Sequence, residues 1–346
     1  FNSNFSLDGF VINLSSTGSI LNSTHLICSD DVYVSSVCAN PDGKVYAFGY
    51  FKGILSVGSL SVQSNGGFDL FAFESKSDGT ILNLINFGGI NDEFLSVAAI
   101  DDNKILMGGI FENEFTHAQI SFQSKGDNDI FVLQTSLQNM SEISWVQAFG
   151  GDQEDSIKDL ILSEEGDIFI AGSFTGNLTF GGNSLVSSGI SDGFIGQLSP
   201  SGDLLFAHGG GGKGADEVNS ILFLNENHIL MGGNFRELLS WGNRSVQSAG
   251  GEDGFVGIVN KEGDCLSLQK IGGSGNDSLN DFFKEGNRVI LLGEFSNDIQ
   301  IGGMNFSSNG QKDIFVSSFD PNLETFSNSL QIGGAGNDNL FSGASA

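Results

Sequence analysis

Short runs of alternating apolar and polar residues, separated by turn-forming residues, fill the whole chain. A typical stretch reads VNSILFL (218–224), then the turn NEN, then HILMGGNF (228–235). DGFVGIV (253–259) and CLSLQKI (265–271) follow around a second turn, with a small hairpin turning on Gly242–Asn243 before them. Runs of this length and period predict β-strands rather than helices. The chain is therefore predicted to be all-β.

The pattern repeats about every 61 residues. An Asp-x-Phe motif opens one strand of each repeat, and its steps along the chain are 61, 60, 63, 61 and 60 residues. The six aspartates of this motif are Asp8, Asp69, Asp129, Asp192, Asp253 and Asp313. A Gly-x-Phe motif recurs in phase at 49–51, 109–111, 172–174, 233–235 and 293–295. Markers that keep one period over a whole chain indicate a repeat array.

Four main strands per repeat favour a β-propeller of about six four-stranded blades, in which each sheet buries both faces against its neighbours. We expect residues 1–346 to form this single domain. The Gly-x-Phe strand occurs five times and the Asp-x-Phe strand six times. The expectation is one blade shared between the N- and C-terminal segments, residues 8–28 and 338–346, that lacks its second strand. Either the natural chain, excised or processed from a longer one, continues past Ala346, or a partner inserts a strand there.

The stretch 166–210 resembles the repeats of secreted and surface proteins of bacteria known as SBBP-type repeats. It carries G-x-I-x-x-x-G-x-F, F-G-G-x-x-L-x-S-x-G and D-x-F-x-x-x-L-x-x-x-G in succession, followed by a closing Gly-Gly. The resemblance implies an exported blade protein, a cell-surface location and a part in adhesion. It implies no catalytic residue, because such a repeat defines a scaffold rather than a reaction.

The composition narrows the range of partners. The chain carries 42 acidic and 14 basic residues, a net charge of −28. So acidic a surface repels phosphate backbones and anionic lipid, so no nucleic acid and no membrane insertion is expected. Three cysteines, Cys28, Cys38 and Cys265, form neither a metal-binding spacing nor a disulfide framework, and we expect small buried side chains there.

Gly-rich segments with an acid precede one strand of each repeat. GGSGNDSLN (272–280) fits the nine-residue calcium pattern G-G-x-G-x-D-x-U-x, but the pattern recurs about every 61 residues rather than every nine. The period predicts six equivalent acids at this point: Asp31, Asp92, Asp155, Asp216, Asp277 and Asp338. We expect each to accept backbone N–H bonds within its own turn. The alternative is a Ca²⁺ ion held among these carboxylates, although no cofactor is required.

Two functions remain open from the sequence. The first is a non-enzymatic binding or structural module that contacts protein or glycan through its loop face. Trp241, Arg236 and His208 are its candidate ligand-binding residues, with hairpin packing as the alternative for Trp241 and an exposed loop position for His208. The second is a glycan-active hydrolase or lyase with acids at a central channel, which requires acids of raised pKa that break the repeat symmetry.

Overall fold

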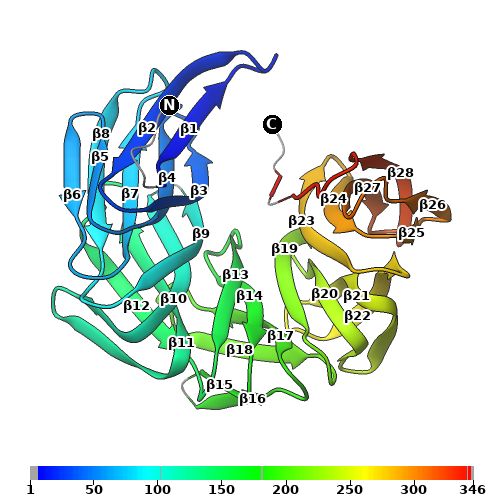
Figure 1. The fold of residues 1–346 in the computed structure, drawn as a ribbon. Helices are drawn as coiled ribbons and strands as arrows, with labels where there is room; N and C mark the ends of the chain where they lie inside the picture. Colours follow the sequence, from blue (N-terminus) through cyan, green and yellow to red (C-terminus); the bar gives the residue numbers. More distant parts are fainter. Residues whose placement is uncertain (1–6, 102, 181, 341, 344–346) are drawn as a thin grey trace. The chain divides into compact units, whose positions relative to one another are not determined.

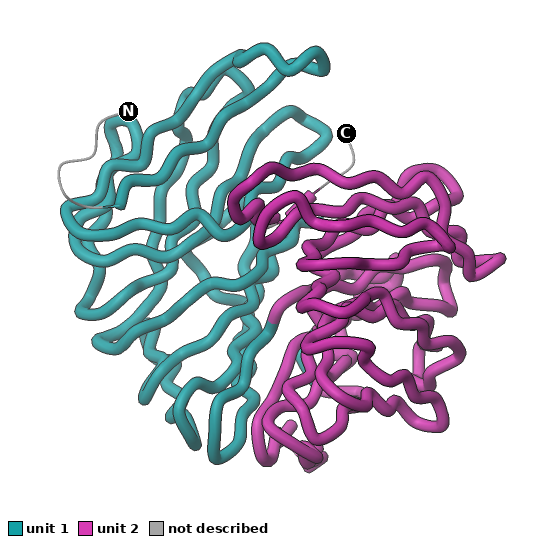
Figure 2. The backbone as a smooth tube through the Cα atoms, turned by 45° about the vertical axis from the view of Figure 1, so that its right-hand side comes forward, with its two compact units in different colours: residues 1–157, 201–203 teal, residues 158–200, 204–346 magenta. Residues whose placement is uncertain are grey.

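The computed structural model of the chain describes residues 7–101, 103–180, 182–340 and 342–343. These residues form β-strands and turns with no helix, as the sequence predicts (Figure 1). None of them forms a helix long and apolar enough to span a membrane. The chain divides into two compact units (Figure 2): unit 1 is Phe1–Ile157 with Ser201–Asp203, and unit 2 is Lys158–Pro200 with Leu204–Ala346.

Three antiparallel sheets form unit 1, and we number the sheets along the chain. Sheet 1 has the order β1-β2-β5-β6, with β1 Gly9–Leu14, β2 Ile20–Cys28, β5 Ile54–Val57 and β6 Leu60–Gln63. Sheet 2 has the order β3-β4-β7-β8, with β3 Val32–Ala39, β4 Val45–Phe51, β7 Asp69–Ser75 and β8 Ile81–Phe87. Sheet 3 has the order β9-β10-β11-β12, with β9 Glu93–Asp101, β10 Lys104–His117, β11 Ile120–Ser136 and β12 Ile143–Phe149.

Three further sheets lie in unit 2, apart from the first residues of β13, where the unit boundary falls. Sheet 4 has the order β13-β14-β17-β18, with β13 Asp155–Leu162, β14 Ile168–Phe174, β17 Asp192–Leu198 and β18 Leu204–Gly210; the hairpin β15 Asn177–Phe180 and β16 Asn183–Val186 accompanies it. Sheet 5 has the order β19-β20-β21-β22-β25-β26, with β19 Glu217–Asn225, β20 His228–Trp241, β21 Arg244–Asn260, β22 Cys265–Gly273, β25 Asp298–Ile301 and β26 Met304–Ser307. Sheet 6 has the order β23-β24-β27-β28, with β23 Asp277–Glu285, β24 Arg288–Phe295, β27 Asp313–Asp320 and β28 Thr325–Ile332.

Sheets 2 to 6 each contain the four main strands that the repeat predicts, in the order first, second, third and fourth. The second strand carries the Gly-x-Phe motif and the third strand the Asp-x-Phe motif. In sheet 1, β1 is of the third type and β2 of the fourth. The structure therefore confirms that the chain forms several four-stranded antiparallel sheets.

Short connecting hairpins link some repeats to the sheet before them. The hairpin β5–β6 follows the second strand of sheet 2, yet β5 pairs with β2 of sheet 1, where Leu26 lies opposite Val57. In unit 2, β25 pairs in the same way with β22, placing Gly273 opposite Ile299. Ser240, in the hairpin that extends β20 and β21, bonds to Gly211 at the end of β18 through both backbone groups. These contacts join consecutive sheets through the backbone.

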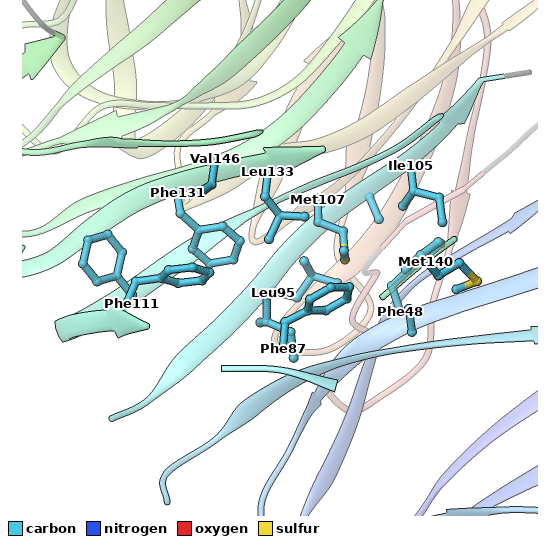
Figure 3. Packing of buried hydrophobic residues seen from close by; sticks show 14 of the residues in the cluster. Phe48, Phe87, Leu95, Ile105, Met107, Phe111, Phe131, Leu133, Met140 and Val146 are labelled. Atoms are coloured by element: carbon cyan, nitrogen blue, oxygen red, sulfur yellow. The ribbon is translucent and has the colours of Figure 1, made fainter. Parts of the chain in front are cut away.

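The apolar cores lie between consecutive sheets of a unit. In unit 1, Figure 3 shows Phe87 and Phe48 of sheet 2 facing Leu95, Met107 and other residues of sheet 3. A second cluster of unit 1 joins sheets 1 and 2, and two clusters of unit 2 join sheets 4 and 5 and sheets 5 and 6. The Phe residues of the two repeat motifs recur in these clusters, so the motifs supply the packing between sheets.

Candidate functional site

Two sets of carboxylates recur from sheet to sheet and are bonded in the same manner. A carboxylate oxygen of each acid accepts the backbone N–H of the residue four positions earlier. In the third strands these acids are Asp69, Asp129, Asp192, Asp253 and Asp313, with donor–acceptor distances of 2.6–3.2 Å. In the first strands and at the equivalent point after sheet 6 they are Glu93, Asp155, Asp216, Asp277 and Asp338, at 2.6–3.4 Å. The carboxylates thus cap the turns that precede the strands.

The in-phase placement of two predicted acids is wrong by one residue. Asp92 accepts the N–H of Phe68, 24 positions earlier, as Asn276 accepts that of Glu252. Asp31 accepts the N–H of Leu7 over the same separation. The residue equivalent to Asp277 is therefore Glu93 in sheet 3 and Val32 in sheet 2. GGINDE and GGSGND have the same length, but GGINDE has its aspartate one position earlier, followed by Glu93, so matching aspartate to aspartate misaligned it.

Glycine is required beside the third-strand carboxylates. A Cβ at Gly150 would lie 2.0 Å from Cγ of Asp129, and one at Gly272 would lie 2.5 Å from Cγ of Asp253. The first glycine of each Gly-Gly pair packs its α-carbon directly on the carboxyl group. Sheet 1 differs, because Ile27 occupies this position, and Cys28, at the position of the second glycine, donates its N–H to Asp8. The glycines that resemble a calcium signature are explained by this close approach.

Burial raises the pKa of several of these acids. Desolvation raises the pKa of Glu93 to about 8. The N–H bond from Gly89 lowers this pKa, and the charges of Asp69 and Asp92 raise it. Desolvation likewise raises the pKa of Asp277 to about 7, and those of Asp69 and Asp216 to about 6. These four side chains are at most 2% exposed. Their altered acidity arises from burial, which outweighs the opposing effect of the N–H bonds that they accept, and solvent does not reach them.

The predicted acids do not fit a Ca²⁺ site. Calcium takes six to eight oxygen ligands, whereas the bonded oxygens of Asp216 and Asp277 face backbone N–H groups. Among the described residues, no three His, Cys, Asp or Glu side chains converge to hold a metal ion. The repeated acids bind the backbone of their own chain.

The three predicted ligand-binding residues do not form one site. Trp241 is 2% exposed, and its Nε1–H donates to the carbonyl oxygen of Gly263 at 3.3 Å, so its ring faces are not available to a ligand. His208 packs on Phe206 and against the same turn at Gly263. Arg236 is half exposed and pairs with Glu252 at 3.1 Å, at the other end of the hairpin. Trp241 and His208 thus pack on one turn, and Arg236 lies apart from them.

The three cysteines have small side chains that are buried or half-buried. Cys28 and Cys265 are buried, Cys38 is half-buried, and none forms a disulfide. Desolvation raises the pKa of all three thiols. Thiols of raised pKa are poor nucleophiles at neutral pH.

Open hollows lie where the turns of consecutive sheets meet. The hollow of unit 2 has a volume of about 460 Å³ and is lined by the turns at 163–165 and 225–227 together with Lys261 and Lys284. Lys261 lies 3.6 Å from Glu165, and Lys284 donates to the carbonyl oxygen of Leu224 at 3.0 Å. A second hollow of about 310 Å³ shares Lys284 and continues past Arg288. Unit 1 has a comparable hollow of about 450 Å³ around Lys44 and Glu74.

Sequence reasoning missed both the third-strand acids as buried groups and the turn hollows. The sequence does contain a signal for the buried acids. An aspartate recurs two residues before a core Phe, in an otherwise apolar segment, which indicates that the aspartate is buried too. The hollows carried none, because their lining turns vary in sequence and are far apart along the chain.

Comparison with known proteins adds no assignment. No protein-family model matches this sequence, and a search of curated proteins finds no match.

Proposed function

We propose that the chain is a non-enzymatic binding or structural module of a secreted or cell-surface protein. The observation that carries the proposal is the shared bonding of the repeated acids, which are the groups that a hydrolase or lyase would need. Glu93, Asp216 and Asp277, repeated acids of raised pKa, are buried and bonded to backbone N–H groups in the same manner from sheet to sheet. A catalytic acid must reach its substrate, and these side chains do not.

The turn hollows are the proposed ligand surface. The 460 Å³ hollow of unit 2 is open, and it combines the apolar Leu162 and Phe223 with carboxylates and two lysines. Mixed charge beside apolar surface suits a polar protein loop or a glycan. The similar hollows at other turns offer a multivalent contact, which raises overall avidity without requiring tight single sites.

We further propose that the six sheets are blades of a β-propeller, with the N- and C-terminal segments sharing one blade. Support comes from the strand order common to sheets 2–6 and from the hairpins that join consecutive sheets. Small-angle X-ray scattering tests the closure. A closed ring of 346 residues has a radius of gyration of about 20 Å. A clearly larger radius, with two maxima in the distance distribution, would contradict it.

Paired assays test the binding role. The chain is screened on glycan and protein arrays, and the same glycans are tested for release of reducing sugar. We expect binding without turnover, and we expect Lys261→Gln in the hollow to weaken binding about tenfold or more. Lys213→Gln, outside the hollow, is the matched control and leaves binding unchanged. Turnover that disappears in Asp216→Asn or Asp277→Asn would establish an enzyme instead.

A further inference from the structure

The strand β1 lies at the end of its sheet, although strands of its type elsewhere have neighbours on both sides. The third strands β7, β11, β17, β21 and β27 each pair with a second strand and with a fourth strand. Within the described residues, the order of sheet 1 is β1-β2-β5-β6, so β1 is its edge. These four strands correspond to β21-β22-β25-β26 of sheet 5, without the counterparts of β19 and β20.

The register between second and third strands is the same in all five complete sheets. The Gly of Gly-x-Phe lies opposite the Phe of Asp-x-Phe, as in Gly49 opposite Phe71 and Gly293 opposite Phe315. The Phe of Gly-x-Phe lies opposite the Asp, as in Phe295 opposite Asp313. The same pairs occur in the other three sheets: Gly109 with Phe131 and Phe111 with Asp129, Gly172 with Phe194 and Phe174 with Asp192, and Gly233 with Phe255 and Phe235 with Asp253.

Glycine is needed there because the aromatic ring lies over the neighbouring strand. A Cβ at Gly293 would lie 2.4 Å from the ring of Phe315, and one at Gly109 would lie 2.6 Å from the ring of Phe131. In sheets 2, 3 and 6 the ring of the third strand is therefore covered by the glycine of its second strand. Phe10, the corresponding residue of β1, is 56% exposed, whereas Phe315 is 0% exposed.

We propose that the edge of β1 binds an extended segment of the Gly-x-Phe type, supplied by a polypeptide other than these 346 residues. The segment pairs antiparallel with β1, its Gly opposite Phe10 and its Phe opposite Asp8, and it continues the interface seen in the five complete sheets. Strand addition at a sheet edge is an established mode of peptide recognition. The inference requires neither closure of the sheets into a ring nor ligand binding in the turn hollows.

A second copy of the chain is not the proposed occupant. Each of its Gly-x-Phe strands is already paired on both sides, for example β20 with β19 and β21, and β24 with β23 and β27. A copy would have to break one of its own sheets to donate such a strand. A separate segment carries no such cost.

The experiment uses the whole chain and a synthetic peptide with the sequence of Arg288–Phe295, RVILLGEF. The control peptide carries Gly293→Val, which raises both β-propensity and hydrophobicity and so retains any non-specific adhesion. We expect the first peptide to bind at least about tenfold more tightly than the control, since the valine side chain would meet the ring of Phe10. We also expect it to slow hydrogen exchange at the β1 amides that point away from β2.

Two protein variants complete the test. Phe10→Ala weakens binding of the peptide, whereas Leu323→Ala, which truncates a 71% exposed side chain in the turn between β27 and β28, does not. Absence of binding, or equal binding of the two peptides, would overturn the proposal. A concentration-dependent dimer of the chain alone that Phe10→Ala abolishes would overturn the assigned occupant in favour of a second copy.

Discussion

The strands β1 and β21 share one sequence motif and differ in what surrounds them. The segment Gly254–Val259 of β21 is buried throughout, and Phe255 is 1% exposed. In β1 every second residue is exposed, with Ile12 at 38% and Leu14 at 53%. Both strands belong to the third type, and both carry a fourth strand and a connecting hairpin on one side.

The difference shows that the motif encodes a strand but does not by itself bury it. The strand β21 also has β20 as a neighbour on its other edge, and its sheet has cores on both faces. Burial is therefore a property of the array. We therefore expect the same Asp-x-Phe sequence to contribute little stability at the end of sheet 1 and a large share in the middle of sheet 5.

Truncation of the motif Phe gives the largest expected contrast. Phe255→Ala leaves a cavity in a close-packed core and is expected to cost about 3–5 kcal/mol of unfolding free energy. Phe10→Ala removes a half-exposed ring and is expected to cost less than about 1 kcal/mol. Urea denaturation of both variants measures the difference. Similar losses would show that β1 is as well packed as β21.

Removal of the motif Asp is expected to give a smaller contrast. Asp253 is 0% exposed, accepts the N–H of Ala249 at 2.6 Å and lies 3.4 Å from Lys270. Asp253→Ala removes this hydrogen bond to a charged acceptor together with the ion pair to Lys270, and is expected to cost about 2 kcal/mol. Asp8→Ala is expected to cost about 1 kcal/mol, because the cap that it removes lies in the partly exposed sheet 1. Thermal unfolding of the two variants ranks them, and the reverse order would contradict the capping account.

Glu93 makes the stability of the fold depend on pH, whereas its counterpart Val32 has no ionisable group. Burial raises the folded-state pKa of Glu93 to about 8, above its unfolded value of about 4.3. The folded protein then binds more protons between these values, so this residue lowers stability as the pH rises from about 4 to 8. Its share of the slope is at most about 1.4 kcal/mol per pH unit.

The variant Glu93→Gln isolates this contribution. We expect the gain in melting temperature over the parent chain to increase between pH 5 and pH 8. Asn91→Ala, which removes an uncharged side chain two positions before Glu93, is the matched control and should show no such trend. A gain that is independent of pH would mean that Glu93 is ionised in the fold.

Chelation is expected to have the smallest effect. Because the repeated acids bond to backbone N–H groups, EDTA should shift the melting temperature by less than about 2 °C. Hydrogen exchange in EDTA should likewise change little, and to the same extent in sheets 1 and 5. Unfolding in EDTA, reversed by added Ca²⁺, would show that a cation holds the turns.

The local elements of the fold were predictable because they depend on period and turn residues. The strands, the small hairpin at Gly242–Asn243 and the 61-residue repeat follow from alternation and spacing. The pairing of β5 with β2 was not predictable, because it joins a hairpin to the sheet before it. The one-residue offset at Glu93 was hidden by the neighbouring Asp92.

The candidate site was predicted less well, for a related reason. A sequence places an acid in a turn but does not show whether its oxygens face N–H groups, a cation or solvent. At Asp277 this is decided by Gly273 and by Ser296, which lies 19 positions later. The sequence leaves open whether Trp241 is exposed in its hairpin or packed. It is buried because β18 packs against it, where a Cβ at Gly210 would lie 2.3 Å from its ring.

Hydrogen exchange of the chain alone, followed by mass spectrometry of peptides, tests the central comparison most directly. We expect amides of Gly9–Leu14 to exchange through local opening at low free energy, and amides of Gly254–Val259 to exchange only near the global free energy of unfolding. Equal and strong protection of the two segments would contradict the account, because β1 would then have a neighbour on its outer edge.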